Sequence, residues 1–243
     1  DGVYGLTMMA KRGVQLLCTY VNFLGAFGGD FYDENYVATL DTPEAIEALE
    51  FLTSLVPYAN PGVLSQDYDE CAATFASGAA AMNIQWQNAA PGFADPEKSQ
   101  IIDQWNIALT PGVSQADGTV LRSPCFGGWD FAIAEDSKNR EALWELIIWA
   151  TSPEMERRLA SAMPSSRKSV LGDPEFQEQY IEYKPMLLSF DHAMGRPRIP
   201  EWPQMSDLIR AALSEAVTGA KSAEQALTDV NPLLNEILMG AGY

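Results

Sequence analysis

The stretch Phe126–Glu154, FGGWDFAIAEDSKNREALWELIIWATSPE, decides the fold because a strand-like pattern passes into a helical one within it. The short apolar run Trp129–Ala134, bounded by glycine and acidic residues, predicts a strand. Two glycines, Gly127 and Gly128, stand directly before Trp129 and clear space around its ring. The ring then either fills a gap in a core or stays bare for a ligand.

The helical part of this stretch, REALWELIIWATS, contains Trp144 and Trp149, which we expect to lie in the core. Outward from it, further short apolar runs predict strands at Val3–Met8, Ala80–Ile84 and Asn106–Leu109. Short strands that alternate with longer helices are typical of an α/β protein. Four strands against about seven helices make a thin sheet for 243 residues, so a part that completes the sheet is expected elsewhere.

A repeated pattern marks the expected helix starts. A capping side chain accepts a backbone N–H, proline fits the first helical position, and glutamate meets the positive end of the helix dipole. Asp67 with Glu70 reads as a capping box before a short helix that Gly78 closes, and Ser222 with Gln225 opens the last helix, which Gly240 ends. The pattern of cap, proline and glutamate occurs at Thr42-Pro43-Glu44, Asp95-Pro96-Glu97, Ser152-Pro153-Glu154 and Asp173-Pro174-Glu175.

Composition excludes several classes of partner. The formal net charge of −18 argues against nucleic acid, because a phosphate backbone requires a basic face. Anionic lipid surfaces are disfavoured for the same reason. Cys18, Cys71 and Cys125 are too few and wrongly spaced for a zinc site or a C-x-x-C motif. Buried free thiols, or one bridged pair and one free thiol, both fit this number.

Catalytic constellations are poorly represented. His192 is the only histidine, so a His-based triad or a multi-histidine metal site has little to draw on. Ser165-Ser166-Arg167-Lys168 matches S-x-x-K, but the companion motifs are absent. No phosphate-binding glycine motif or calcium loop is found, and no metal or cofactor is expected. Paired carboxylates of a glycosidase remain open, since carboxylates are plentiful.

Three tryptophans lie at the edges of elements rather than within periodic faces. Trp86 follows the run AAAMNIQW, Trp129 follows the glycine pair, and Trp202 lies between prolines in RPRIPEWPQMS. A ring presented from a strand end or loop can lie flat against the C–H face of a sugar. Each could instead fill a gap in the core, and a ring flanked by prolines often only fixes a loop.

The ordered set of motifs resembles the extracellular solute-binding proteins of sugar ABC transporters, relatives of maltose-binding protein. The F-x-x-G-x-x-A-M segment (Phe75, Gly78, Ala81, Met82) and the block around Ser137–Glu154 are its most specific parts. The other segments that carry the resemblance are VYGLTMMAKRG, FGGDFYDEN, TPEAIEALEFLTSL, IPEWPQMS and EQALTDVNPLLNEIL, in this order.

The resemblance implies an α/β fold of the periplasmic binding protein type (type II), with two lobes, a hinge and a ligand cleft between the lobes. Residues 1–126 and 167–243 would form a discontinuous C-terminal lobe, and residues 127–166 a returning segment of the N-terminal lobe. The crossovers would fall near Cys125–Trp129 and Met163–Arg167. Most of the N-terminal lobe has no counterpart here, so we expect this chain to be mainly the C-terminal lobe of a longer protein.

The resemblance also suggests ligand contacts. Trp86 would lie on the wall of the C-terminal lobe and Trp129 at the crossover, with Gly127 and Gly128 leaving room for a sharp backbone turn and a ligand. Cationic side chains after the first strand and at the second crossover could donate hydrogen bonds to hydroxyl groups, or stand as solvated charges. The candidate ligand-binding residues are Trp86, Trp129, Gly128, Arg12, Lys11, Arg167, Trp202 and Asp130.

The function implied is non-enzymatic: capture of a sugar or polyol by hinge closure and its delivery to an ABC-transporter permease. The implied location is periplasmic or extracellular, with a lipid anchor on a preceding segment as one option, and the complete protein is expected to be a monomer. One alternative is a carbohydrate-active hydrolase. Another keeps the fold and changes the ligand to a phosphorylated polyol, a peptide or a polyamine. The sugar itself and the disulfide state stay open.

Overall fold

The computed structural model describes residues 2–243 and contains two apolar runs that pair far apart in sequence. Its strands are β1 (Thr7–Met8), β2 (Asn83–Ile84), β3 (Val113–Ser114) and β4 (Val120–Leu121). Its helices are α1 (Val14–Leu24), α2 (Pro43–Leu55), α3 (Tyr68–Ala76), α4 (Ala90–Ala94), α5 (Arg140–Ala150), α6 (Pro153–Leu159), α7 (Lys168–Leu171), α8 (Pro174–Gln179), α9 (Tyr183–Ser189), α10 (Trp202–Val217) and α11 (Ala223–Ala241), with short 3-10 turns at Val56–Tyr58, Val63–Ser65 and Gln87–Ala89.

The small parallel sheet confirms the first two predicted strands. Strands β1 and β2 pair in parallel, with Thr7 opposite Asn83 and Met8 opposite Ile84. Isolated parallel bridges extend the pairing on either side, from Tyr4 to Ala80 and from Leu6 to Ala59. Parallel strands require a crossover connection, and α1, α2 and α3 supply it here.

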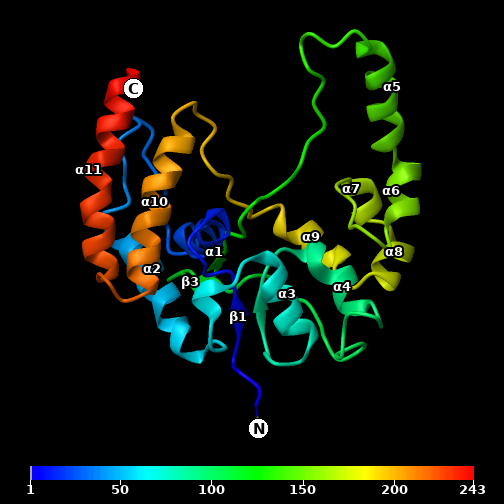
Figure 1. The fold of residues 1–243 in the computed structure, drawn as a ribbon, viewed down its shortest axis with the longest axis horizontal. Coiled ribbons are helices and arrows are strands. Elements are labelled where there is room, and N and C mark those ends of the chain that lie inside the picture. The colour runs from blue at the N-terminus through cyan, green and yellow to red at the C-terminus, as the bar shows by residue number, and fades with distance from the viewer. Residues whose placement is uncertain (1) are drawn as a thin grey trace.

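The main core lies among four helices on one side of this sheet (Figure 1). Helices α10 and α11 run side by side and pack with α1 and α2. Asn231 of α11 fastens the chain before α2: its Oδ1 accepts from the Leu40 amide at 2.9 Å, and its Nδ2 donates to the Ala38 carbonyl at 3.1 Å. Two smaller clusters, one around Phe93 and one around Tyr183, hold the opposite half of the molecule.

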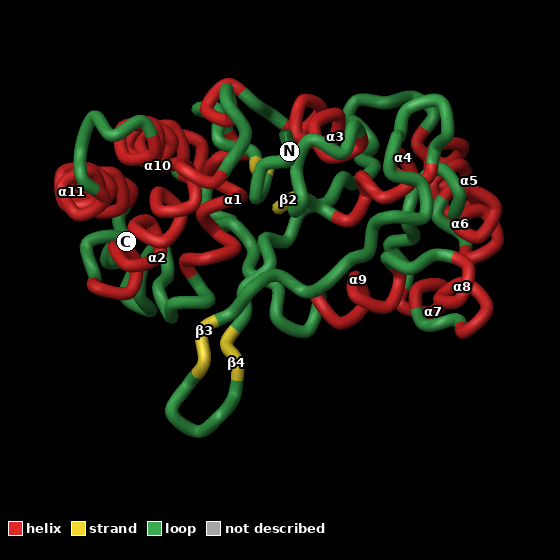
Figure 2. The backbone as a smooth tube through the Cα atoms, turned by 90° about the horizontal axis from the view of Figure 1, so that it is seen from below, coloured by secondary structure: helices red, strands yellow, loops and turns green. Residues whose placement is uncertain are grey.

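Helices α5 and α6 form an arm that stands beyond this second half (Figure 1). The chain reaches the arm along residues 127–139, which run away from the core, and returns from it into α7. A two-stranded hairpin, β3 and β4, protrudes elsewhere from the molecule (Figure 2).

Most predicted helix caps are confirmed. Asp67 and Glu70 form a capping box, and the side chains of Ser152, Asp173 and Ser222 each accept a backbone N–H at the starts of α6, α8 and α11. At Thr42 the helix begins as predicted, but its hydroxyl donates to the Thr39 carbonyl at 3.0 Å and does not cap the helix. At Asp95 the predicted helix is wrong, because this side chain accepts from the Glu97 amide within a turn that does not continue as a helix. The last helix also continues past Gly240 to a left-handed Gly242.

Two of the four predicted strands are wrong. Residues 106–109 pair with no strand, and a cavity of about 390 Å³ separates that segment from β2. Residues 129–134 are also unpaired, with Trp129 and Phe131 101% and 68% exposed. Both runs have strand composition but no partner strand beside them, and a strand requires one. The β3–β4 hairpin was missed, although Asp117-Gly118 is a strong hairpin signal.

The expectation that Trp144 and Trp149 lie in the core is wrong for this structure. Both side chains are 56% exposed, and α5 has no buried residue. Helical periodicity predicted the helix correctly, but it does not say whether a partner covers the apolar face.

Candidate ligand site

Trp86 lies just after β2, against the segment that leaves the main body. Its indole Nε1 donates to the carbonyl of Cys125 at 3.1 Å, and its ring centroid lies 6.3 Å from that of Tyr68, with 30° between the planes. The side chain is half-buried. Trp86 is therefore held in a fixed orientation at the first predicted crossover.

The two glycines before Trp129 have different surroundings. A Cβ added at Gly127 would lie 3.2 Å from Nε1 of Trp86, whereas one added at Gly128 would meet nothing within 4 Å. Neither glycine has a positive φ, so a left-handed turn does not explain the pair. Gly127 instead makes room for the ring of Trp86, and Gly128 leaves open space beside the fully exposed Trp129.

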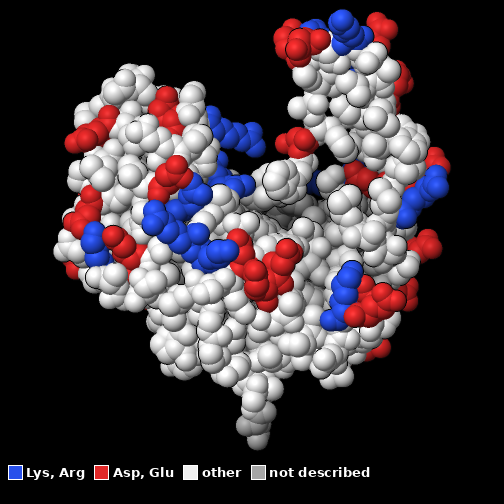
Figure 3. Space-filling view, in the orientation of Figure 1, with Lys and Arg blue, Asp and Glu red and all other residues white. Residues whose placement is uncertain are grey.

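The charged candidates near the first strand and beside Trp129 point into solvent. Lys11 and Arg12 occupy the loop between β1 and α1, where the Lys11 amide donates to the Gln66 carbonyl at 3.0 Å while both side chains stay exposed. Asp130 is exposed next to Trp129. Figure 3 shows Lys and Arg side chains gathered next to a hollow, on the half of the molecule that holds α10 and α11. The surface is otherwise rich in carboxylates.

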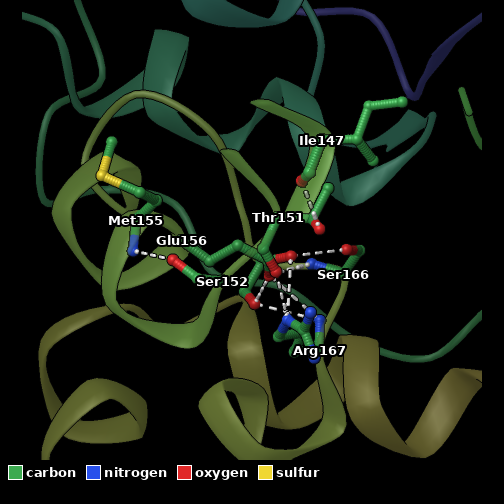
Figure 4. Close-up of polar contacts among 8 residues, drawn as sticks. Ile147, Thr151, Ser152, Met155, Glu156, Ser166 and Arg167 are labelled. Carbon is green, nitrogen blue, oxygen red and sulfur yellow. Dashed lines mark hydrogen bonds and ion pairs between the residues drawn. The ribbon is translucent and has the colours of Figure 1, made fainter. Parts of the chain in front are cut away.

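Arg167 is tied to the protein by the second predicted crossover itself (Figure 4). Its Nε donates to the Thr151 carbonyl and lies 3.6 Å from a carboxylate oxygen of Glu156. The same carboxylate accepts from the hydroxyls of Ser165 and Ser166, and from the amides of Ser166 at 3.0 Å and Arg167 at 3.2 Å. Glu156 therefore fixes the returning chain, and the Nε edge of the Arg167 guanidinium is engaged in the same network.

Trp202 begins α10 and packs within the main core rather than standing on a loop. Its ring meets that of Phe31 edge to face, with centroids 5.0 Å apart, and the side chain is only partly exposed. Its position matches the alternative in which the ring fixes local structure. The structure thus brings Trp86 together with the first crossover, whereas Arg167 and Trp202 lie in other parts of the molecule.

Tyr68 was missed as a candidate residue. It is the first residue of α3, and burial raises the pKa of its phenol, with the Asp69 carboxylate adding to the effect. Its hydroxyl donates to the side chain of Asn88 at 3.1 Å. The capping box explained its position fully, so the sequence carried no separate signal that its ring would lie beside Trp86.

The hollow in Figure 3 lies between the half that holds α10 and α11 and the arm of α5 and α6. Trp129 belongs to the segment that crosses from one to the other. Among residues 2–243, no group of three or more His, Cys, Asp or Glu side chains is placed to hold a metal ion. Within the same range, no helix has both the length and the apolar character needed to cross a membrane.

A family model described as "Bacterial extracellular solute-binding protein" matches residues 5–157, which is more than half of the chain. The chain belongs to this family of bacterial extracellular solute-binding proteins. Curated relatives of the chain include a probable amino-acid ABC transporter periplasmic-binding protein from Sinorhizobium fredii, 26% identical over 100% of the chain and 55% of the relative. A mannitol-binding protein from Pseudomonas aeruginosa is 26% identical over 100% of the chain and 60% of the relative.

Solved structures of solute-binding proteins superpose closely on the chain. The maltose-bound MalE3 of T. maritima gives a TM-score of 0.87 with 27% identity, over 97% of this chain and 61% of that one. A ribitol complex from Agrobacterium radiobacter gives 0.85 with 27% identity, over 97% and 60%. A D-mannitol complex from Agrobacterium vitis gives 0.81 with 25% identity, over 100% and 62%.

The predicted fold class is confirmed: the chain has the periplasmic binding protein-like fold of its structural relatives. The chain spans about 55–60% of the length of the two curated relatives.

Proposed function

We propose that the complete protein binds a sugar or polyol in a cleft between two lobes and delivers it to an ABC-transporter permease. The observation that carries this proposal is the fully exposed Trp129 on the segment that crosses the hollow, two residues after the glycine that packs on Trp86, in a family member. An exposed indole costs free energy in water and gains most against the C–H face of a carbohydrate. Structures similar to this chain hold ribitol, D-mannitol and maltose.

The candidate residues divide into two roles under this proposal. Trp129 and Trp86 supply apolar faces, and Gly128 leaves a ligand room beside Trp129. Lys11 and Arg12 donate hydrogen bonds to hydroxyl groups, and Asp130 accepts them. Arg167 contributes less to ligand binding, because its Nε is engaged by Thr151 and Glu156. Trp202 has a structural role, because its ring packs against Phe31.

The division of the chain into lobes is part of the proposal. Residues 1–126 and 167–243 form one lobe, and residues 127–166 belong to the other. In support, α5 exposes a set of large apolar side chains that soluble proteins normally cover. Their exposed fractions are 56% for Trp144, 52% for Leu146, 47% for Ile148 and 56% for Trp149. We propose that a further α/β unit packs on this helix.

Membership of an extracellular family indicates action outside the cytoplasm. We further propose a monomer whose closed, ligand-bound form docks on the permease. The measured ligand affinity then combines the free energy of the ligand contacts with the free energy of closing the two lobes. The protein returns its ligand unchanged, as expected of a transport protein rather than an enzyme.

Thermal-shift and calorimetric titration of the complete protein with mannitol, ribitol, maltose and other sugars tests this function. A specific ligand should raise the melting temperature in a concentration-dependent manner. Chromatography of the released ligand should recover it intact. Turnover of a glycoside would favour the hydrolase alternative, and a shift only with amino acids, phosphorylated polyols, peptides or polyamines would reject the sugar or polyol assignment.

A further inference from the structure

The segment that leads into the first crossover is clamped onto α1 by side chains. Ser123 Oγ donates to the carbonyl of Val21 at 3.3 Å, and the amide of Cys125 donates to Asn22 Oδ1 at 2.8 Å. Nδ2 of Asn22 donates in turn to the carbonyl of Cys18 at 3.0 Å. A single amide side chain therefore connects the backbones of Cys18 and Cys125.

This clamp brings two thiols together from positions about 100 residues apart. Cys18 and Asn22 are one helical turn apart, so they share a face of α1. Cys18 is fully buried and Cys125 is 6% exposed, and both line the same cavity of about 390 Å³. Both are free thiols on the wall of that cavity.

The environment polarises the pair. The Cys125 thiol, as a hydrogen-bonding partner, holds the pKa of Cys18 below its ordinary value despite burial. The same contact, together with burial, raises the pKa of Cys125. The guanidinium of Arg196 lowers the pKa of both thiols as a smaller effect.

The third cysteine is placed differently. Cys71 lies on α3, where burial raises the pKa of its thiol to about 11. Its Sγ donates to Gln66 Oε1 at 3.9 Å. Cys71 is therefore a buried thiol without thiolate character.

We propose that Cys18 and Cys125 form a disulfide that fastens the first crossover to α1. The oxidant is a disulfide of low-molecular-weight or protein-thiol type, as found in the oxidising compartments where extracellular proteins fold. The Cys18 thiolate attacks one sulfur of that disulfide and releases one thiol. Cys125, after losing its proton, attacks the mixed disulfide and releases the second. Two electrons pass to the oxidant, and each released thiolate takes up one of the two protons.

Because both thiols are buried in the folded chain, the disulfide should form during folding rather than on the finished protein. The bond would close a long loop and restrict the unfolded chain more than the native one. It would also fix the point from which residues 127–166 leave the main body, and so define one end of the hinge.

Refolding of the reduced protein in a mixture of oxidised and reduced glutathione tests the disulfide. When the refolded protein is then unfolded in denaturant without blocking its thiols, Ellman's reagent should count one free thiol per chain, against three in a sample reduced with dithiothreitol. Cys71→Ala should lower the oxidised count to none, whereas Cys18→Ala and Cys125→Ala should each leave two. Mass spectrometry of the Cys71→Ala protein should show the loss of two hydrogens, which avoids ambiguity about partners.

A melting temperature that rises by several degrees on oxidation, in the wild type and in Cys71→Ala but not in Cys18→Ala, would support the assignment. Three free thiols after oxidative refolding to a native circular dichroism spectrum would overturn it. A bridge that includes Cys71 would overturn it as well. Neither result depends on ligand binding, so the disulfide and the transport function can fail separately.

Discussion

The adjacent glycines of the first crossover offer a sharp test, because only one of them touches another side chain. A Cβ at Gly127 would lie 3.2, 3.3 and 3.5 Å from three atoms of the Trp86 indole, and a valine would add two methyl groups to this contact. We expect Gly127→Val to displace the ring and to break its hydrogen bond to the Cys125 carbonyl. Overpacking costs about 1–3 kcal/mol and a lost hydrogen bond about 1 kcal/mol, so the loss should be about 2–4 kcal/mol.

Gly128→Val is the matched control, since nothing lies within 4 Å of its Cβ position and its φ is not positive. Its free energy of unfolding should change by no more than about 0.5 kcal/mol. Urea denaturation followed by circular dichroism measures both variants, and Gly127→Val should also melt about 6 °C lower. Equal effects of the two substitutions would refute the explanation that Gly127 exists to accommodate Trp86.

Three further predictions concern fixed polar contacts. Asn231→Ala leaves the buried amide of Leu40 and the carbonyl of Ala38 unpaired, so urea denaturation should show a free energy of unfolding lower by about 2–4 kcal/mol. The control Asn235→Ala should lower it by about 1 kcal/mol, because Asn235 Oδ1 accepts only the Ala38 amide. Similar losses for the two variants would contradict this prediction. Glu156→Ala removes the acceptor for four hydrogen bonds at the second predicted crossover and should lower the free energy of unfolding by about 2 kcal/mol. The control Glu154→Ala, at an exposed neighbour, should leave it unchanged. An unchanged free energy for Glu156→Ala would show that this network is dispensable. Arg157, 2.7 Å away, holds the pKa of Asp173 below its ordinary value of 3.8, so this ion pair stabilises the fold above that pH and the stabilisation is lost as the pH falls through the lowered pKa. The urea midpoint of Asp173→Asn should therefore fall less steeply on acidification than that of the wild type. Parallel curves for the two proteins would argue against this role.

Local signals predicted the helices well, because each cap is made by residues close in sequence. The capping box of Asp67 and Glu70 and the cap of Ser222 could be predicted without knowledge of the rest of the fold. The two runs that contain β1 and β2 were predicted as strands from their composition, but their parallel pairing with each other was not predicted.

The strands at residues 106–109 and 129–134 could not be settled this way, since a strand depends on a neighbour that its own residues do not specify. The same limit applies to Trp144 and Trp149, whose periodic pattern predicts an apolar face but not whether a partner covers it. Within the candidate site, the two glycines before Trp129 left both a buried and an exposed ring open, and the structure shows the exposed one. The contact of Gly127 with Trp86 did not, because it joins residues that only the folded chain brings together.

The most direct test of the proposed function is isothermal titration calorimetry of the complete protein and its Trp129→Ala variant with the sugar or polyol that gives the largest thermal shift. An exposed residue on the outer helix, Met239, supplies the control substitution Met239→Ala. Trp129→Ala should weaken binding by about 2 kcal/mol or more, close to 30-fold, while Met239→Ala leaves the affinity unchanged. Unchanged affinity of the Trp129→Ala variant would contradict a ligand contact at the crossover, and no binding of any sugar or polyol by the wild type would contradict the function itself.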